Sequence, residues 1–210
     1  PETFASQVRR RVVKHSPLGV RPSPDVIHAH EAAIRQYWTK ERMAAAIPKP
    51  LPIVDSKWED KGLIPASPPG FRFRTMPRPS GAPATQPFDT TLVSNLTISP
   101  YCSVGKLFFT WKGTDHDCSA SIVNDYLLLT AAHCLYDEGE YSTNISCVIQ
   151  YKDGQGAATY AYLEGYLLQD WINGTSYAAD FAFIETITSM TQPVLGIDFG
   201  GDQRGPVTSI

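Results

Sequence analysis

The residue best suited to chemistry in this sequence is His133, an imidazole at the end of an apolar stretch. Histidine changes its charge near neutral pH, so it can take up a proton during a reaction and return it later. Two apolar runs before it, 120–123 and 126–129, have the composition of strands, and the pair Asn124 and Asp125 between them is typical of a turn. The sequence therefore predicts a hairpin that carries His133 at the end of its second strand.

Four cysteines accompany this hairpin. Cys118 and Cys134 lie at its two ends, so their side chains can meet across it, and we expect a disulfide in an oxidising compartment. Closing that loop would stabilise the fold by about 3 kcal/mol on the chain-entropy estimate. Cys102 and Cys147 remain as a second candidate pair, which would tie the entry strand to the strand after the histidine. Spacing alone does not decide their connectivity.

The segment Thr130-Ala131-Ala132-His133-Cys134, with a cysteine sixteen positions before Cys134, resembles the histidine segment of chymotrypsin-like serine peptidases. The run Val104-Gly-Lys-Leu-Phe-Phe-Thr-Trp, followed by Cys118-Ser-Ala-Ser, is most similar to the microbial glutamyl-endopeptidase-like branch of that family. The resemblance implies that His133 is the general base of peptide-bond hydrolysis. The alternative is a structural disulfide hairpin that presents His133 as an ordinary surface histidine.

The resemblance extends to Asp180, which lies 47 positions after His133 and precedes the apolar run 181–184. The family has an aspartate at about this distance, at the start of a strand, and its buried carboxylate accepts the Nδ1 proton of the histidine and fixes the tautomer. Taken alone, an aspartate before a strand is also an ordinary end of a loop. With the resemblance, His133 and Asp180 are the expected catalytic residues.

The nucleophilic serine that the resemblance requires has no counterpart in the sequence. The family's Gly-x-Ser-Gly-Gly segment, whose backbone amides form the oxyanion hole, does not occur among the thirty residues after Asp180. Ser209 has no glycines around it, and neither Ser176 nor Ser189 lies in a Gly-x-Ser-Gly-Gly context. We therefore expect a part of a longer peptidase, inactive on its own. The alternatives are a processed chain that stays with a second chain and a non-catalytic peptidase-like module that binds a protein.

Composition limits the remaining function classes. The 210 residues carry a formal net charge of −3 and no apolar run long enough to span a membrane, so neither nucleic acid nor membrane is an expected partner. An even number of cysteines and three acceptor sequons, at Asn95, Asn144 and Asn173, indicate a secreted glycoprotein. The resemblance implies a polypeptide substrate, a protein inhibitor as a further partner, and no cofactor.

Residues 1–90 differ from the rest, because they hold most of the prolines and no cysteine. Ser23 and Pro24 begin a predicted helix that runs to about residue 46, and a proline-rich linker follows over 48–87. This order resembles a propeptide that keeps a peptidase latent until it is cut, for example after Arg72, Arg74 or Arg78; the alternative is a surface tether. We expect no metal site, since His28 and His30 would point to different faces of the helix.

The expected fold is all-β. Short predicted strands at regular spacing favour a sandwich or barrel, and the resemblance implies the first six-stranded barrel of a two-barrel chymotrypsin-like fold over residues 91–195. Residues 196–210 would be the crossing to a second, truncated barrel. The strand candidates are 107–111, 120–123, 126–130, 145–151, 158–168 and 181–187.

Overall fold

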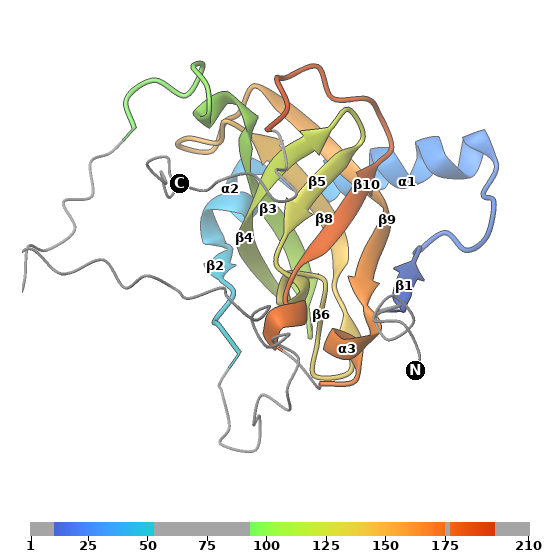
Figure 1. Cartoon of the computed structure of the whole chain (residues 1–210). Coiled ribbons are helices and arrows are strands. Elements are labelled where there is room, and N and C mark those ends of the chain that lie inside the picture. The colour runs from blue at the N-terminus through green and yellow to red at the C-terminus, as the bar shows by residue number, and fades with distance from the viewer. Residues whose placement is uncertain (1–10, 53–92, 175–176, 196–210) are drawn as a thin grey trace, which may run out of the picture.

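The computed structural model describes residues 11–52, 93–174 and 177–195. Figure 1 shows a strand-rich body with a long helix on one side of it. Several sequence predictions lie outside the described residues: most of the proline-rich linker, the candidate cut sites Arg72, Arg74 and Arg78, and the crossing at 196–210.

Six antiparallel strands close into a barrel, which confirms the predicted fold class. Neighbouring strands pair in the order β9, β10, β5, β4, β3, β8, and a further pairing of β8 with β9 closes the ring. Closure leaves no free edge among these strands. The strands are β3 (Val104–Trp111), β4 (Thr114–Asn124), β5 (Leu127–Thr130), β8 (Thr143–Ile149), β9 (Ala158–Leu168) and β10 (Ala182–Thr186).

The barrel interior is filled by alternate residues of these strands, as the pleat requires. Leu107 and Phe109 of β3 pack inward with Ile122 of β4 and Leu128 of β5, and all four side chains are buried. Phe108 belongs to a second, smaller core cluster, yet it is also fully buried. The reason is that residues from the amino-terminal part of the chain cover this outer face.

That amino-terminal part adds two strands to the sheet. Strand β1 (Val12–His15) pairs antiparallel with the end of β9, and β2 (Ile47–Pro48) pairs parallel with β4. These two short strands pair with β9 and β4 along stretches of backbone that the neighbouring barrel strands do not use. The extension that the sequence set apart from the barrel is therefore joined to it by backbone hydrogen bonds.

Two helices replace the single helix expected over 24–46. Helix α1 (Pro24–Tyr37) begins at the predicted cap, where Ser23 accepts a hydrogen bond from Val26 N, and α2 (Lys40–Ala45) begins at Thr39, whose Oγ1 accepts from Arg42 N at 3.2 Å. Trp38 breaks the helix between them with a non-helical backbone. Its indole is buried, and its Nε1 donates to the carbonyl of Asn144 at 2.5 Å.

Short elements connect the strands. A 3-10 turn (Ala132–Cys134) follows β5, a small ribbon of β6 (Tyr136–Asp137) and β7 (Glu140–Tyr141) comes next, and α3 (Gln169–Ile172) and a second 3-10 turn (Tyr177–Ala179) lead into β10. A further 3-10 turn (Tyr101–Ser103) enters β3. Within the described ranges, none of the helices has the length and apolar character needed to cross a bilayer.

Candidate active site

The predicted hairpin forms, and it places His133 just beyond its second strand. β4 and β5 pair antiparallel, with Ser121 opposite Leu129. The turn lies at residues 125–126, one position later than predicted, because Asn124 still pairs with Leu127 as the last residue of β4. At the end of β5 the hydroxyl of Thr130 donates to the carbonyl of Ser119 at 2.8 Å. The chain then enters the 3-10 turn that holds His133, which is only 5% exposed. The histidine is therefore fixed by a paired strand and a tight turn.

Strand β10 brings Asp180 to the same place. It pairs antiparallel with β5, Ala182 lies opposite Thr130, and Asp180 precedes that pair by two residues. One carboxylate oxygen of Asp180 accepts the backbone N–H of His133 at 2.9 Å, and the other lies 2.8 Å from Nδ1 of the ring. The two residues that the resemblance singled out thus meet side chain to side chain.

The electrostatics of this pair favour an ionised carboxylate. Burial of Asp180 opposes its charge, but hydrogen bonds from the imidazole and from the backbone N–H groups of His133 and Ala132 outweigh that effect and hold the pKa of Asp180 below its ordinary value. An ionised Asp180 requires the proton of the imidazole to sit on Nδ1, where it can be donated. The other ring nitrogen, Nε2, is then the one that can accept a proton.

A disulfide between Cys118 and Cys134 lies beside the histidine. It joins β4 to the 3-10 turn and so restrains the residue next to His133 in the chain. The sulfurs and a ring nitrogen of His133 lie within 4.8 Å of one another, which is close enough for a metal site. Metal binding by cysteine requires thiolates, however, and an oxidised pair has none to offer.

The other predicted sites are placed as follows. Cys102 and Cys147 are buried free thiols in the structure, so the second disulfide that the sequence left open is not formed. The sulfur of Cys147 lies directly against Gly105, where an added Cβ would come within 2.7 Å of it. Cys102 instead contacts Ser103, with 3.8 Å between Sγ and Oγ. Burial raises the pKa of Cys147 to about 12, so its thiol stays protonated.

The three sequon asparagines differ in exposure. Asn95 and Asn173 are exposed, whereas Asn144 is half-buried and its side-chain amide donates to the Thr110 hydroxyl at 3.2 Å. His116 belongs to β4, is buried, and contacts the rings of Phe109 and Trp111.

A pocket of 660 Å³ opens beside His133 and contains a feature that sequence reasoning missed. Its wall includes Lys106 and Asp117, whose side chains form an ion pair at 3.0 Å, and also Pro48, Lys49 and Leu51 from the amino-terminal part of the chain. A two-residue strand has too short a pattern to be recognised in a sequence. No sequence signal therefore connected residues 48–51 with His133.

Comparisons with known proteins show which family the chain resembles. The trypsin family model matches residues 103–207. No curated protein matches the chain. A solved thermostable serine protease, AL20 from an extremophilic microorganism, is 30% identical, with 40% of this chain and 42% of that one covered and a TM-score of 0.38.

Two further solved structures are similar over comparable stretches. A Glu endopeptidase in complex with MPD is 27% identical, covering 47% of this chain and 45% of that one, with a TM-score of 0.40. Protease Anisep from Arthrobacter nicotinovorans is 27% identical, covering 48% and 51%, with a TM-score of 0.43. The chain spans about half, or less, of the length of these proteins.

Proposed function

The chain belongs to the trypsin family, and from that premise we propose that it is the amino-terminal part of a secreted serine endopeptidase in which His133 and Asp180 are catalytic. The observation that carries the proposal is the double contact of Asp180 with His133, through the backbone N–H at 2.9 Å and through Nδ1 at 2.8 Å. A histidine in this position has one nitrogen oriented by a carboxylate and the other available to a nucleophile.

In the proposed mechanism His133 moves the proton and Asp180 positions the ring. Nε2 of His133 removes the proton of a serine hydroxyl as the serine oxygen attacks the carbonyl carbon of a peptide bond, and it then donates that proton to the leaving amine. Asp180 stabilises the imidazolium formed in between. Water then hydrolyses the acyl intermediate with the same histidine as base.

We assign the serine and the oxyanion-hole amides to sequence outside this chain, because the chain contains no Gly-x-Ser-Gly-Gly segment. The substrate is a polypeptide, and a protein inhibitor and a completing carboxy-terminal segment are the further partners. Secretion is proposed from the sequons and the Cys118–Cys134 disulfide.

The deciding experiment is to sequence the transcript past Ile210, express the encoded protein and label it with a fluorophosphonate probe. We expect stoichiometric labelling of a serine in the added sequence, loss of peptide hydrolysis in His133→Ala, and no labelling of the 210-residue chain alone. A stop codon directly after Ile210, together with a native secreted protein whose mass is that of a chain ending at Ile210, would instead favour a non-catalytic module that binds a protein.

A further inference from the structure

The amino-terminal segment, residues 11–52, surrounds much of the barrel. Figure 1 shows β1 beside β9, α1 extending across the side of the barrel, and α2 and β2 next to β4. Both ends of the segment are paired with barrel strands: Val12 lies opposite Leu168, and Ile47 lies opposite His116. The segment is thus attached at two separate places, with the helices between them.

An apolar anchor lies between these attachments. Ile34 of α1 and Trp38 after it are buried against Phe108, Val148 and Ala161 of the barrel. The Trp38 and Phe108 rings are 5.4 Å apart between centroids. Phe108 is on the outside of the barrel and fully buried, so without this cover a phenylalanine and a valine would face water.

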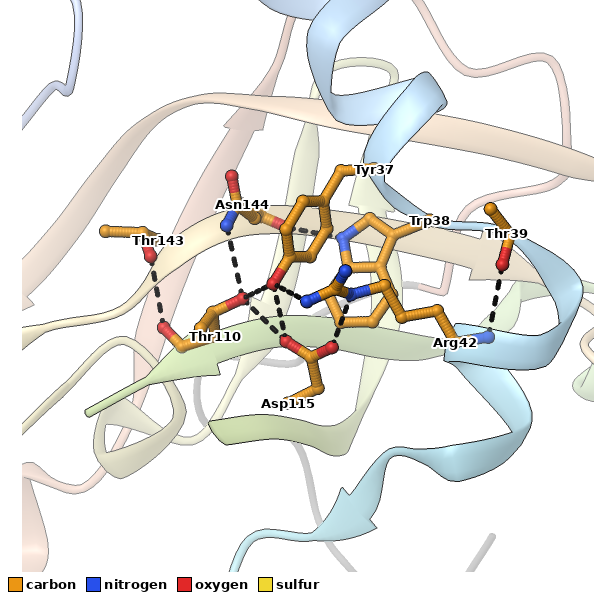
Figure 2. A network of polar contacts seen from close by, with 8 residues as sticks. All are labelled: Tyr37, Trp38, Thr39, Arg42, Thr110, Asp115, Thr143 and Asn144. Carbon is orange, nitrogen blue, oxygen red and sulfur yellow. Dashed lines mark hydrogen bonds and ion pairs between the residues drawn. The ribbon is translucent and has the colours of Figure 1, made fainter. Parts of the chain in front are cut away.

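A polar anchor adjoins the apolar one, as Figure 2 shows. Asp115 of β4 accepts hydrogen bonds from the Tyr37 hydroxyl at 2.8 Å and from Nε of Arg42 at 2.6 Å. The guanidinium of Arg42 also stacks on the Tyr37 ring, 3.8 Å from its centroid, and Nη2 donates to the Tyr37 hydroxyl at 2.6 Å. The Thr110 hydroxyl donates to the same carboxylate oxygen as Tyr37. Three side chains from two parts of the chain therefore satisfy one carboxylate.

A third anchor is Lys49, directly after β2. Its side chain is only 1% exposed, and its Nζ lies 2.8 Å from a carboxylate oxygen of Asp137 and 2.9 Å from the centre of the Trp111 ring. The backbone N–H of Lys49 donates to the carbonyl of Asp117 at 2.9 Å. Separation of the segment would leave the barrel with an unpaired Asp137 and an uncovered indole.

From these three anchors we propose that the segment 11–52 is a permanent part of the folded unit, which binds the barrel as an internal ligand and stays bound when the chain is cut after residue 52. A removable propeptide would be held by contacts that the mature protein can lose. Here the contacts complete a hydrophobic cluster and neutralise two barrel carboxylates. The segment also supplies Pro48, Lys49 and Leu51 to the wall of the pocket that contains His133, so its loss would remove one side of that pocket. The inference concerns packing and does not depend on the proposed catalysis.

The test is to insert a recognition sequence for a site-specific protease between Pro69 and Gly70 of the otherwise native chain, cut it, and pass the product through gel filtration at micromolar concentration. We expect the two pieces to elute together with the mass of the uncut chain. Elution of the amino-terminal piece alone, with the rest still folded, would overturn the proposal and restore the removable propeptide.

Two variants show whether the observed anchors cause the retention. Trp38→Ala should weaken binding of the cut segment by about 100-fold, because a buried indole is lost. Val26→Ala, on helix α1 in the same segment but 46% exposed, should leave binding unchanged. Equal dissociation constants for both variants would contradict the assignment of Trp38.

Hydrogen exchange on the uncut native chain provides a measurement that needs no variant. The β1 amides that pair with β9 should exchange at rates within about tenfold of the paired β9 amides, since opening of one strand exposes both. Exchange of the β1 amides at the rate of a free peptide would also overturn the proposal.

Discussion

Asp180 contacts His133 at two points, and the two contacts restrain different degrees of freedom. The hydrogen bond from the backbone N–H, at 2.9 Å, fixes where the histidine backbone lies relative to β10, and the contact with Nδ1, at 2.8 Å, fixes the rotation of the ring. Because both use the same carboxylate, the position of the histidine backbone and the orientation of its ring both depend on the residue that leads into β10. Substitution of Asp180 by asparagine removes the charge and keeps the side-chain volume, so the role of the charge can be measured.

Asp180→Asn should keep the shape of the site and remove its charge. In the complete enzyme we expect kcat/KM for a peptide substrate to fall by about 10⁴-fold, since an amide can hold the wrong imidazole tautomer and cannot stabilise the imidazolium. Asp153→Asn is the control, because Asp153 is exposed and its positive φ of 51° suits asparagine. An Asp180→Asn enzyme that retained more than about a tenth of wild-type kcat/KM would remove Asp180 from the mechanism.

The same carboxylate predicts how stability depends on pH. Its folded-state pKa is lowered relative to its ordinary value of 3.8, so ionised Asp180 stabilises the fold at every pH above that value. This contribution is lost as the pH falls through the folded pKa, because the carboxyl becomes protonated and its bonds to His133 weaken. Denaturant titrations between pH 6 and about pH 2 should show that acidification costs the wild type more free energy of unfolding than Asp180→Asn. Parallel curves for the two proteins would contradict the prediction.

The sequence predicted those elements whose pattern is long or whose chemistry is local. The hairpin at 118–134 and the all-β class follow from apolar runs and turn residues, and the structure contains both, with the turn one residue later than predicted. The meeting of His133 with Asp180 came from the family resemblance, because nothing in the spacing of two residues 47 apart determines that β10 pairs with β5.

The parts that escaped prediction depend on tertiary contacts. No glycine or proline at Trp38 predicts the helix break there. The break occurs because the indole packs on Phe108 and donates to the Asn144 carbonyl. Strands β1 and β2, of four and two residues, are too short for a periodic pattern, and barrel strands determine their pairing. Lys49 lies between two prolines, where nothing in the local sequence indicates that its side chain is buried.

Thiol chemistry should separate the two cysteine pairs. Unfolded, non-reduced protein should titrate two thiols with a disulfide reagent, since Cys118 and Cys134 are joined and Cys102 and Cys147 are free. In the folded protein Cys147 should not react with iodoacetamide at pH 8, because it is buried and its pKa is raised to about 12. Cys118→Ala together with Cys134→Ala should lower the free energy of unfolding by about 3 kcal/mol. Titration of no thiols in the unfolded, non-reduced protein would mean that the second pair is also oxidised.

Glycan occupancy should follow the exposure of the sequons. Asn95 and Asn173 are exposed, and we expect both to carry glycans when the protein is made in a eukaryotic secretory host. Asn144 should be unmodified, because its amide donates to Thr110 and Ser146 of the same sequon is buried. Peptide mass mapping before and after deglycosylation measures all three sites. Full occupancy at Asn144 would show that the sequon is modified before the segment containing Trp38 covers it.

The buried cation of Lys49 leads to the last prediction, which compares two lysines beside one tryptophan. Lys49 is 1% exposed and pairs with Asp137 at 2.8 Å, with its Nζ 2.9 Å from the Trp111 ring centre. Lys112 is 39% exposed, pairs with the still more exposed Glu138 at 2.6 Å, and lies 4.6 Å from the same ring centre. Lys49→Met should therefore cost about 3 kcal/mol of unfolding free energy, because it leaves a mostly buried carboxylate without its partner.

Lys112→Met is the matched control and should leave the free energy of unfolding nearly unchanged, since water screens and replaces an exposed pair. Adding Asp137→Asn to Lys49→Met should cost less than the sum of the two single changes, because the second substitution removes the charge that the first left unpaired. Urea unfolding of the four variants and the wild type measures these differences. Equal losses for Lys49→Met and Lys112→Met would show that burial of the first pair contributes nothing, and strict additivity with Asp137→Asn would show that the two side chains do not interact in solution.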